Sequence, residues 1–183
     1  MLTMGVFRPA QLSIHGDLPL RRVHIIGRKN SGKTTLIIDL VKCLTAQGHA
    51  VGTIKHTHHR HELDTPGKDS HRHREAGARV VGILSQQMTA VFRPRRDAEG
   101  AVDRYALLAP NFLDCDLVLV EGDLQAQAPK VEVWRASLGE APLASRNETI
   151  LAVITDDPLD LPVSTWSRSS IEALADQIRR LAG

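Results

Sequence analysis

Residues 27–34 of this 183-residue chain read Gly-Arg-Lys-Asn-Ser-Gly-Lys-Thr, which is the spacing of a phosphate-binding loop. Gly27 and Gly32 permit backbone conformations that a Cβ would forbid, so the loop can point its N–H groups at a phosphate. Lys33 supplies a charge for the β- and γ-phosphates, and Thr34 offers a hydroxyl to the accompanying Mg²⁺. These residue types predict binding of a nucleoside triphosphate. The alternative is a glycine-rich turn that only begins a helix.

A phosphate-binding loop needs a carboxylate on the Mg²⁺ side, and two acids flank the apolar run 117–120. Ligands of open α/β sheets bind at the carboxyl ends of the strands, which favours Glu121 over Asp116. A carboxylate that only ends a strand or pairs with a lysine is the alternative. Asp64 and Asp69 are further candidates for holding Mg²⁺ or positioning a water, unless they are solvated loop acids.

Recognition of guanine often uses the tetrapeptide Asn-Lys-x-Asp at the end of a late strand, and this chain has no such tetrapeptide. Thr155-Asp156-Asp157 follows the apolar run 150–154 at the corresponding place. The carboxylate of Asp156 could accept hydrogen bonds from guanine N1–H and its exocyclic amine. Alternatively, these residues only form a turn before Pro158.

Six of the nine histidines fall between positions 56 and 73, namely His56, His58, His59, His61, His71 and His73. Imidazoles are ligands for Zn²⁺ and Ni²⁺, although this spacing matches no closed zinc site. The same segment is rich in basic residues: Lys55, Arg60, Lys68, Arg72 and Arg74. An anion-facing loop beside the triphosphate is the simpler interpretation, and metal binding is kept as the alternative.

The elements expected around these residues alternate between strands and helices. Apolar or β-branched runs predict strands, and they are 23–26, 50–55, 80–85, 88–92, 117–120, 130–135 and 150–155. Helical periodicity predicts helices over 36–44 (with Gly48 as its C-terminal cap), 68–77, 102–114 and 171–181, the last capped by Ser169 or Ser170. The pattern indicates an α/β fold like that of P-loop NTPases, a mostly parallel sheet flanked by helices, with an inserted β-rich segment. We expect residues 1–20 to be an N-terminal extension and 21–183 to be one P-loop domain.

The composition excludes several classes of protein. The formal net charge is only +2, which does not favour a nucleic-acid binder. No apolar stretch approaches the ~20 residues of a membrane span. Cys43 and Cys115 are far apart, so neither a disulfide framework nor a thiolate metal site is expected, and a cytoplasmic location fits.

Several segments together resemble one family, the molybdopterin-guanine dinucleotide biosynthesis adapter proteins, or MobB family. The matching segments are 27–36, 51–56, 64–70 (Asp-Thr-Pro-Gly-Lys-Asp-Ser), 71–78 (His-Arg-His-Arg-Glu-Ala-Gly-Ala), 116–122 and 129–133. The resemblance implies a GTP- and Mg²⁺-binding homodimer with weak GTPase activity. Its implied partners are the molybdopterin guanylyltransferase and other molybdenum cofactor proteins, with molybdopterin as a further ligand.

The resemblance also implies roles for individual residues. The phosphates would be held by Gly27, Lys29, Asn30, Ser31, Gly32, Lys33, Thr34 and Thr35. Glu121 would take the metal side, and Lys68, Asp69 and Arg72 would line the nucleotide. One departure is Asp123-Leu124, where family members often have an aromatic residue and a lysine; Lys130 and Arg146 are candidate substitutes for that lysine.

Two other functions fit parts of the sequence. The first is a GTPase that delivers metal to nickel enzymes through the histidine cluster. The second is a small-molecule kinase with Arg93, Arg95 and Arg96 on a lid. No arginine finger or water-orienting glutamine stands in a known context, so we expect at most slow GTP hydrolysis.

Overall fold

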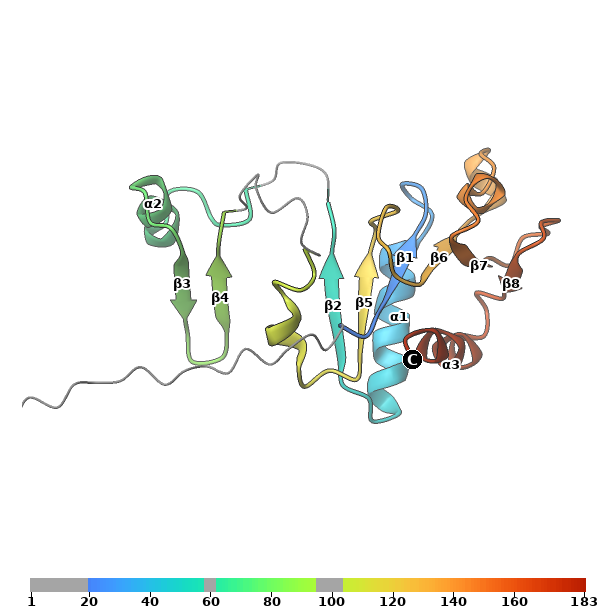
Figure 1. Cartoon of the computed structure of the whole chain (residues 1–183), viewed down its shortest axis with the longest axis horizontal. Coiled ribbons are helices and arrows are strands. Elements are labelled where there is room, and N and C mark those ends of the chain that lie inside the picture. Colours follow the sequence, from blue (N-terminus) through green and yellow to red (C-terminus); the bar gives the residue numbers. More distant parts are fainter. Residues whose placement is uncertain (1–19, 58–61, 95–103) are drawn as a thin grey trace, which may run out of the picture.

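The computed structural model describes residues 20–57, 62–94 and 104–183, and its main feature is a six-stranded sheet (Figure 1). The strands are β1 (Arg22–Ile26), β2 (Val51–Lys55), β5 (Leu117–Glu121), β6 (Lys130–Val133), β7 (Ile150–Ile154) and β8 (Ser164–Trp166). They lie in the order β2-β5-β1-β6-β7-β8, and every neighbouring pair is parallel. All six carboxyl ends therefore meet at one edge of the sheet. The predicted mostly parallel α/β sheet is confirmed.

Two helices cover one face of this sheet. They are α1 (Lys33–Ala46) and α3 (Ile171–Leu181), and they pack against each other as well as against the strands. Leu36, Leu40 and Leu44 of α1 and Leu174 and Ile178 of α3 are fully buried, because apolar residues recur at helical spacing on the inner side. As expected, Gly48 follows the end of α1 with a positive φ of 89°.

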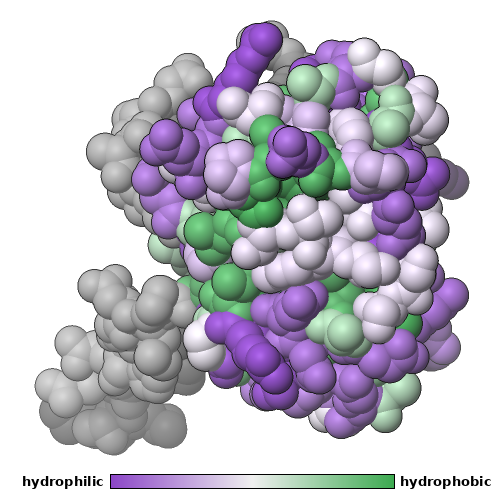
Figure 2. Space-filling model, turned by 90° about the vertical axis from the view of Figure 1, so that its right-hand side faces the viewer, coloured by the Kyte–Doolittle hydropathy of each residue, from purple (hydrophilic) through white to green (hydrophobic). Residues whose placement is uncertain are grey.

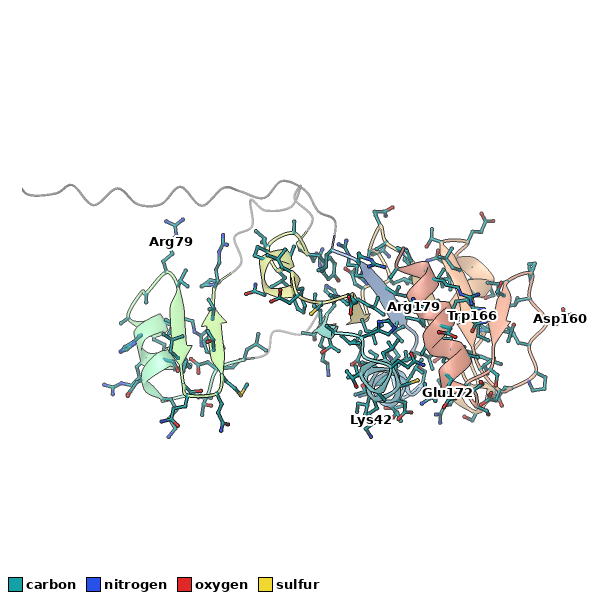
Figure 3. All side chains as sticks on the ribbon, turned by 90° about the horizontal axis from the view of Figure 1, so that it is seen from below. Lys42, Arg79, Asp160, Trp166, Glu172 and Arg179 are labelled. Atoms are coloured by element: carbon teal, nitrogen blue, oxygen red, sulfur yellow. The ribbon has the colours of Figure 1, made fainter. Side chains whose placement is uncertain are left out.

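The opposite face of the sheet is covered near β5 by residues 104–113. Tyr105 packs there with Val118 and Val120, the residues of β5 that point away from α1. In Figure 3 this segment and α1 lie on opposite sides of the strands. The helix predicted over 102–114 is wrong over its described part: residues 104–108 form turns, and Ala109–Phe112 is a short 3₁₀ helix, η2. Pro110, which has no N–H to donate, breaks the α-helical pattern.

The inserted β-rich segment is confirmed as a separate unit, which we call the arm and define as residues 62–94. It contains α2 (Asp69–Glu75) and an antiparallel hairpin of β3 (Val81–Leu84) and β4 (Thr89–Phe92). The hairpin forms its own two-stranded sheet, and Figure 1 shows the arm standing beyond the β2 edge of the six-stranded sheet.

The arm leaves many apolar side chains exposed: Leu63, Val80, Ile83, Leu84, Met88 and Val91. The opposite end of the molecule, which carries β8 and α3, has a more polar surface than the arm. Figure 2 shows polar side chains there around small apolar patches.

The connection between β6 and β7 holds two further 3₁₀ helices, η3 (Ala136–Leu138) and η4 (Leu143–Arg146). The buried carboxylate of Glu132 in β6 accepts hydrogen bonds from the backbone N–H groups of Leu143 and Ala144, both at 2.8 Å. This fixes the connection beside the carboxyl edge of the sheet. Burial raises the pKa of Glu132, although the two backbone hydrogen bonds oppose that effect.

Among the described residues, no helix is both long and apolar enough to cross a membrane. The expected N-terminal extension, 1–20, lies outside the described residues except for Leu20.

Candidate functional site

The phosphate-binding loop connects the carboxyl end of β1 to the first turn of α1. Gly27 has φ 144°, and a Cβ there would lie 2.4 Å from the carbonyl oxygen of Val133 in the neighbouring strand. Gly32, the N-cap of α1, has φ 97°. Both positions therefore require glycine, and the loop wraps the positive end of the α1 dipole as a phosphate cradle would.

Lys33 lies half-buried in this loop, where its Nζ donates a 2.7 Å hydrogen bond to the carbonyl oxygen of Arg28. Burial lowers the pKa of Lys33, and the nearby carboxylate of Glu121 partly opposes that shift. A pocket of 470 Å³ opens beside it, lined by Lys29, Asn30, Gly32, Lys33, Thr34, Thr35, Glu121 and Arg135. The structure thus brings most of the residues proposed for the phosphates to one pocket.

Glu121 stands next to the loop, at the carboxyl end of β5. The Thr34 hydroxyl donates a 2.9 Å hydrogen bond to Glu121 Oε1. A hydroxyl and a carboxylate are hard oxygen ligands of the kind that Mg²⁺ prefers, so these two residues fit that ion. Asp116, the competing acid, lies at the other edge of the sheet and accepts a hydrogen bond from the backbone N–H of Ala50.

Asp156 lies at the carboxyl end of β7, and its carboxylate is surrounded by donors from residues 167–169. It accepts from the hydroxyls of Ser167 and Ser169 and from the backbone N–H groups of Arg168 and Ser169, at 2.7–3.1 Å. These bonds, led by that from Ser167, lower the pKa of Asp156. Asp156 therefore joins the ends of β7 and β8 just before α3. The Ser170 side chain makes no capping hydrogen bond, contrary to the prediction.

The sequence and the fold both match one known family. The family model for molybdopterin guanine dinucleotide synthesis protein B, MobB, matches residues 22–156. The chain belongs to the MobB family. It is 36% identical over 149 residues to the molybdopterin-guanine dinucleotide biosynthesis adapter protein of Escherichia coli (strain K12). The aligned region covers 80% of this chain and 84% of that protein. The protein of the same name from Haemophilus influenzae is 34% identical over 165 residues, 90% of each chain.

Solved structures agree with this assignment. A crystal structure of molybdopterin-guanine biosynthesis protein B superposes with a TM-score of 0.66 at 27% identity, covering 88% of this chain and 98% of that chain. A MobB protein homologue from Bacillus stearothermophilus gives 0.59 at 26% identity, covering 88% and 99%. These MobB matches support neither the nickel-delivery GTPase nor the small-molecule kinase. Arg95 and Arg96, two of the three arginines of the expected kinase lid, lie outside the described residues.

The departure at Asp123 has a structural explanation that the sequence did not reveal. Asp123 is 7% exposed, has φ 64°, and accepts a 2.7 Å hydrogen bond from the hydroxyl of Tyr105. Although burial pushes the pKa of Asp123 upward, this hydrogen bond and the charges of His56 and Arg104 bring it below its usual value. The bond ties residues 104–113 to the turn that follows Glu121. The signal in the sequence was Asp123 itself, an acid at a position where family members often have an aromatic residue.

Other residues proposed for the site lie on the arm. Lys68, Asp69 and Arg72 are exposed on or beside α2, and Arg72 NH1 is 3.9 Å from Asp69 Oδ1. Asp64 is buried within the arm and accepts hydrogen bonds from the Thr65 N–H and the Ser70 hydroxyl. Within one chain, the structure does not bring these four residues to the phosphate-binding loop (Figure 1).

The histidine cluster divides between described and undescribed positions. His58, His59 and His61 lie outside the described residues. Of the others, His56 Nε2 lies 2.8 Å from Arg104 NH1, and His71 lies between the carboxylates of Glu62 and Glu75. In the described parts of the chain, no group of three or more potential ligands is arranged to hold a metal ion.

One residue that sequence reasoning missed also lines the phosphate pocket. Arg135 follows β6 at the carboxyl edge, and its guanidinium lies against Gly32. The rule that placed Glu121 at this edge could have identified Arg135 too, since β6 is also a buried strand.

Proposed function

We propose that this MobB-family chain is a GTP-binding adapter in the biosynthesis of molybdopterin-guanine dinucleotide. It would assist the molybdopterin guanylyltransferase, which attaches GMP to molybdopterin. The observation that carries the proposal is the contact between Thr34 and Glu121, which lies beside Lys33 in the loop. The relatives from Escherichia coli and Haemophilus influenzae, which are named as adapter proteins of this pathway, support the role.

In this proposal the triphosphate lies in the loop from Gly27 to Thr35. Phosphate oxygens replace the carbonyl of Arg28 as the acceptors for Lys33, while Thr34 and Glu121 hold Mg²⁺. Bound Mg²⁺ would neutralise phosphate charge. The guanine would lie toward the ends of β7 and β8, where its N1–H and exocyclic amine would replace the donors from residues 167–169 that bond to the carboxylate of Asp156. Hydrolysis is at most slow.

The arm supports a homodimer. It exposes six large apolar side chains to solvent, which is unusual for a monomer, and a second copy of the chain would cover them. Such pairing would also give the exposed Lys68, Asp69 and Arg72 a site on the partner, since they do not reach the loop of their own chain, whereas Asp64 is buried within the arm. Residues 21–183 would then act as one P-loop domain with the arm as its insertion.

The test is a reconstituted guanylyltransferase reaction. Purified guanylyltransferase, molybdopterin, GTP and Mg²⁺ are mixed with or without this chain, and molybdopterin-guanine dinucleotide is measured over time. We expect faster or more complete formation with the chain, and no gain with Lys33→Ala. Equal formation with and without the wild-type chain would contradict the adapter role.

A further inference from the structure

The pocket beside the phosphate-binding loop contains a cation from outside the loop motif. Arg135 comes two residues after β6, the strand that pairs with β1 at Ile26↔Glu132. A Cβ on Gly32 would lie 2.9 Å from one terminal nitrogen of Arg135, 3.4 Å from its Cζ and 3.5 Å from its Nε. The guanidinium therefore lies beside Gly32, at the start of α1.

The backbone that carries Arg135 is fixed on both sides. The indole N–H of Trp134 donates to the carbonyl oxygen of Glu140 at 2.8 Å, and the Trp134 backbone N–H donates to Ile154. On the other side, the N–H of Ala136 donates to Asp157 Oδ2 at 2.8 Å. Because these bonds hold the neighbours, the base of the Arg135 side chain is preorganised at the pocket.

Arg28 of the loop and Arg135 beside it differ in whether a carboxylate neutralises their charge. Arg28 NH1 lies 2.6 Å from Glu140 Oε2, so its charge is already neutralised. Arg135 is exposed and forms no ion pair with any carboxylate of the described residues; Glu121, the acid in its pocket, bonds to Thr34 instead. The lining of this pocket holds Lys29, Lys33 and Arg135 against one acid, a charge balance suited to a polyanion.

From this geometry we propose that Arg135 is a triphosphate ligand, supplied in cis from outside the loop motif. Its planar guanidinium matches two phosphate oxygens at once, which a lysine ammonium does not. Arg135 would approach the triphosphate from the Gly32 side, with Lys33 and the Mg²⁺ held by Thr34 and Glu121 on the other. This inference rests on the proposed binding of GTP in the loop.

The test compares three variants by isothermal titration with GTP in the presence of Mg²⁺. Arg135→Met keeps an unbranched apolar side chain but removes the guanidinium and its charge, and Arg135→Lys keeps the charge but not the planar guanidinium. Arg180→Met is the matched control, because Arg180 is an exposed arginine of α3 that does not line this pocket. Thermal unfolding checks that all three variants are folded.

We expect Arg135→Met to raise the Kd for GTP about tenfold or more, the effect of losing a hydrogen bond between charged groups. The Kd of Arg135→Lys should lie between those of Arg135→Met and the wild type, and Arg180→Met should bind GTP as the wild type does. Wild-type affinity in Arg135→Met would overturn the inference and leave the proposed function standing, since it would show that Arg135 only packs. Equal weakening in Arg135→Met and Arg180→Met would also overturn it, because it would show an effect of overall charge. Failure of the wild-type chain to bind GTP would instead overturn the proposed function and the inference with it.

Discussion

At the scale of single residues, Lys33 provides the most direct contact expected for the phosphates. Replacing Lys33 with alanine should weaken GTP binding at least about tenfold, because a charge-assisted hydrogen bond is lost. The fold should be kept, since among the described residues the Nζ of Lys33 donates its hydrogen bond to the carbonyl oxygen of Arg28 in the same loop. Lys42→Ala is the control, because Lys42 is exposed on the same helix, about two and a half turns beyond Lys33. Equilibrium binding of GTP to both variants measures the effect, and equal affinities would contradict the assignment.

Glu121 is the residue expected to act through the metal. Glu121→Gln keeps an oxygen to accept from Thr34 but removes the charge that Mg²⁺ needs, so the gain in GTP affinity on adding Mg²⁺ should shrink. Titrations of GTP with Mg²⁺ and with EDTA measure that gain. Asp116→Asn is the matched control at the opposite edge of the sheet. An equal loss of affinity in both buffers would count against a metal role for Glu121.

Residues at the site differed in how well the sequence revealed them. The loop and Glu121 follow from local spacing and from the strand-end rule, and the structure places them together. Arg135 and the Tyr105–Asp123 bond were missed, because they join segments that are distant in sequence. A contact between two residues that are distant in sequence cannot be recognised from the residues that flank either of them in the chain.

At the scale of elements, β1 carries a buried histidine that should make stability depend on pH. His24 is fully buried; its Nδ1 lies 3.0 Å from the carbonyl oxygen of Gly122, and its Nε2 has no partner among the described residues. Burial lowers the pKa of His24, although the bond to Gly122 opposes that shift. The unfolded chain thus binds a proton at a higher pH than the folded one does. Stability should fall as pH drops below the usual histidine value, by at most about 1.4 kcal/mol per pH unit from this group.

Urea unfolding between pH 7.5 and 5.5 tests this expectation. The slope of the free energy of unfolding against pH should be smaller in His24→Gln than in the wild type. His49→Gln is the control, because His49 is a partly exposed histidine in the loop after α1. Identical slopes for His24→Gln and the wild type would contradict a buried, neutral His24.

The elements themselves were largely predictable. Buried parallel strands such as β5 and β7 read as continuous apolar runs, and α1 and α3 show clear helical spacing. The structure of the segment before β5 was not predicted correctly. Tyr105 and Phe112 have helical spacing, but Pro110 limits this segment to a short 3₁₀ helix. What begins α3 was also missed: Asp156, far away in sequence, bonds the backbone just before the helix.

At the scale of the whole molecule, the arm is expected to hold two copies together. The double variant Leu84→Asp/Val91→Asp places charges on two exposed apolar positions of the β3–β4 hairpin, whose side chains lie outside the core of the main sheet. Light scattering after size exclusion should therefore show a dimer for the wild type and a monomer for this variant. Leu151→Asp, an exposed leucine of β7, is the control and should remain dimeric. A wild-type monomer, or a variant that stays dimeric, would contradict the role of the arm.

The inserted β-rich segment was predicted from the chain, but the sequence did not predict that its two strands form a sheet of their own. The runs 80–85 and 88–92 have the composition of strands, but composition does not say which sheet a strand joins. Backbone pairing is decided by segments that meet only in the fold, here β3 with β4 alone. For the same reason the sequence placed Lys68, Asp69 and Arg72 beside the nucleotide, whereas the structure places them on the arm.

The central claim is that the loop from Gly27 to Thr35 binds GTP, and one calorimetric measurement tests it most directly. The purified full chain is titrated with GTP and, separately, with ATP, each with Mg²⁺. We predict one GTP site per chain and a lower Kd for GTP than for ATP, because the proposed role is in a pathway that attaches a guanine nucleotide to molybdopterin. No binding of either nucleotide, or tighter binding of ATP, would contradict the account.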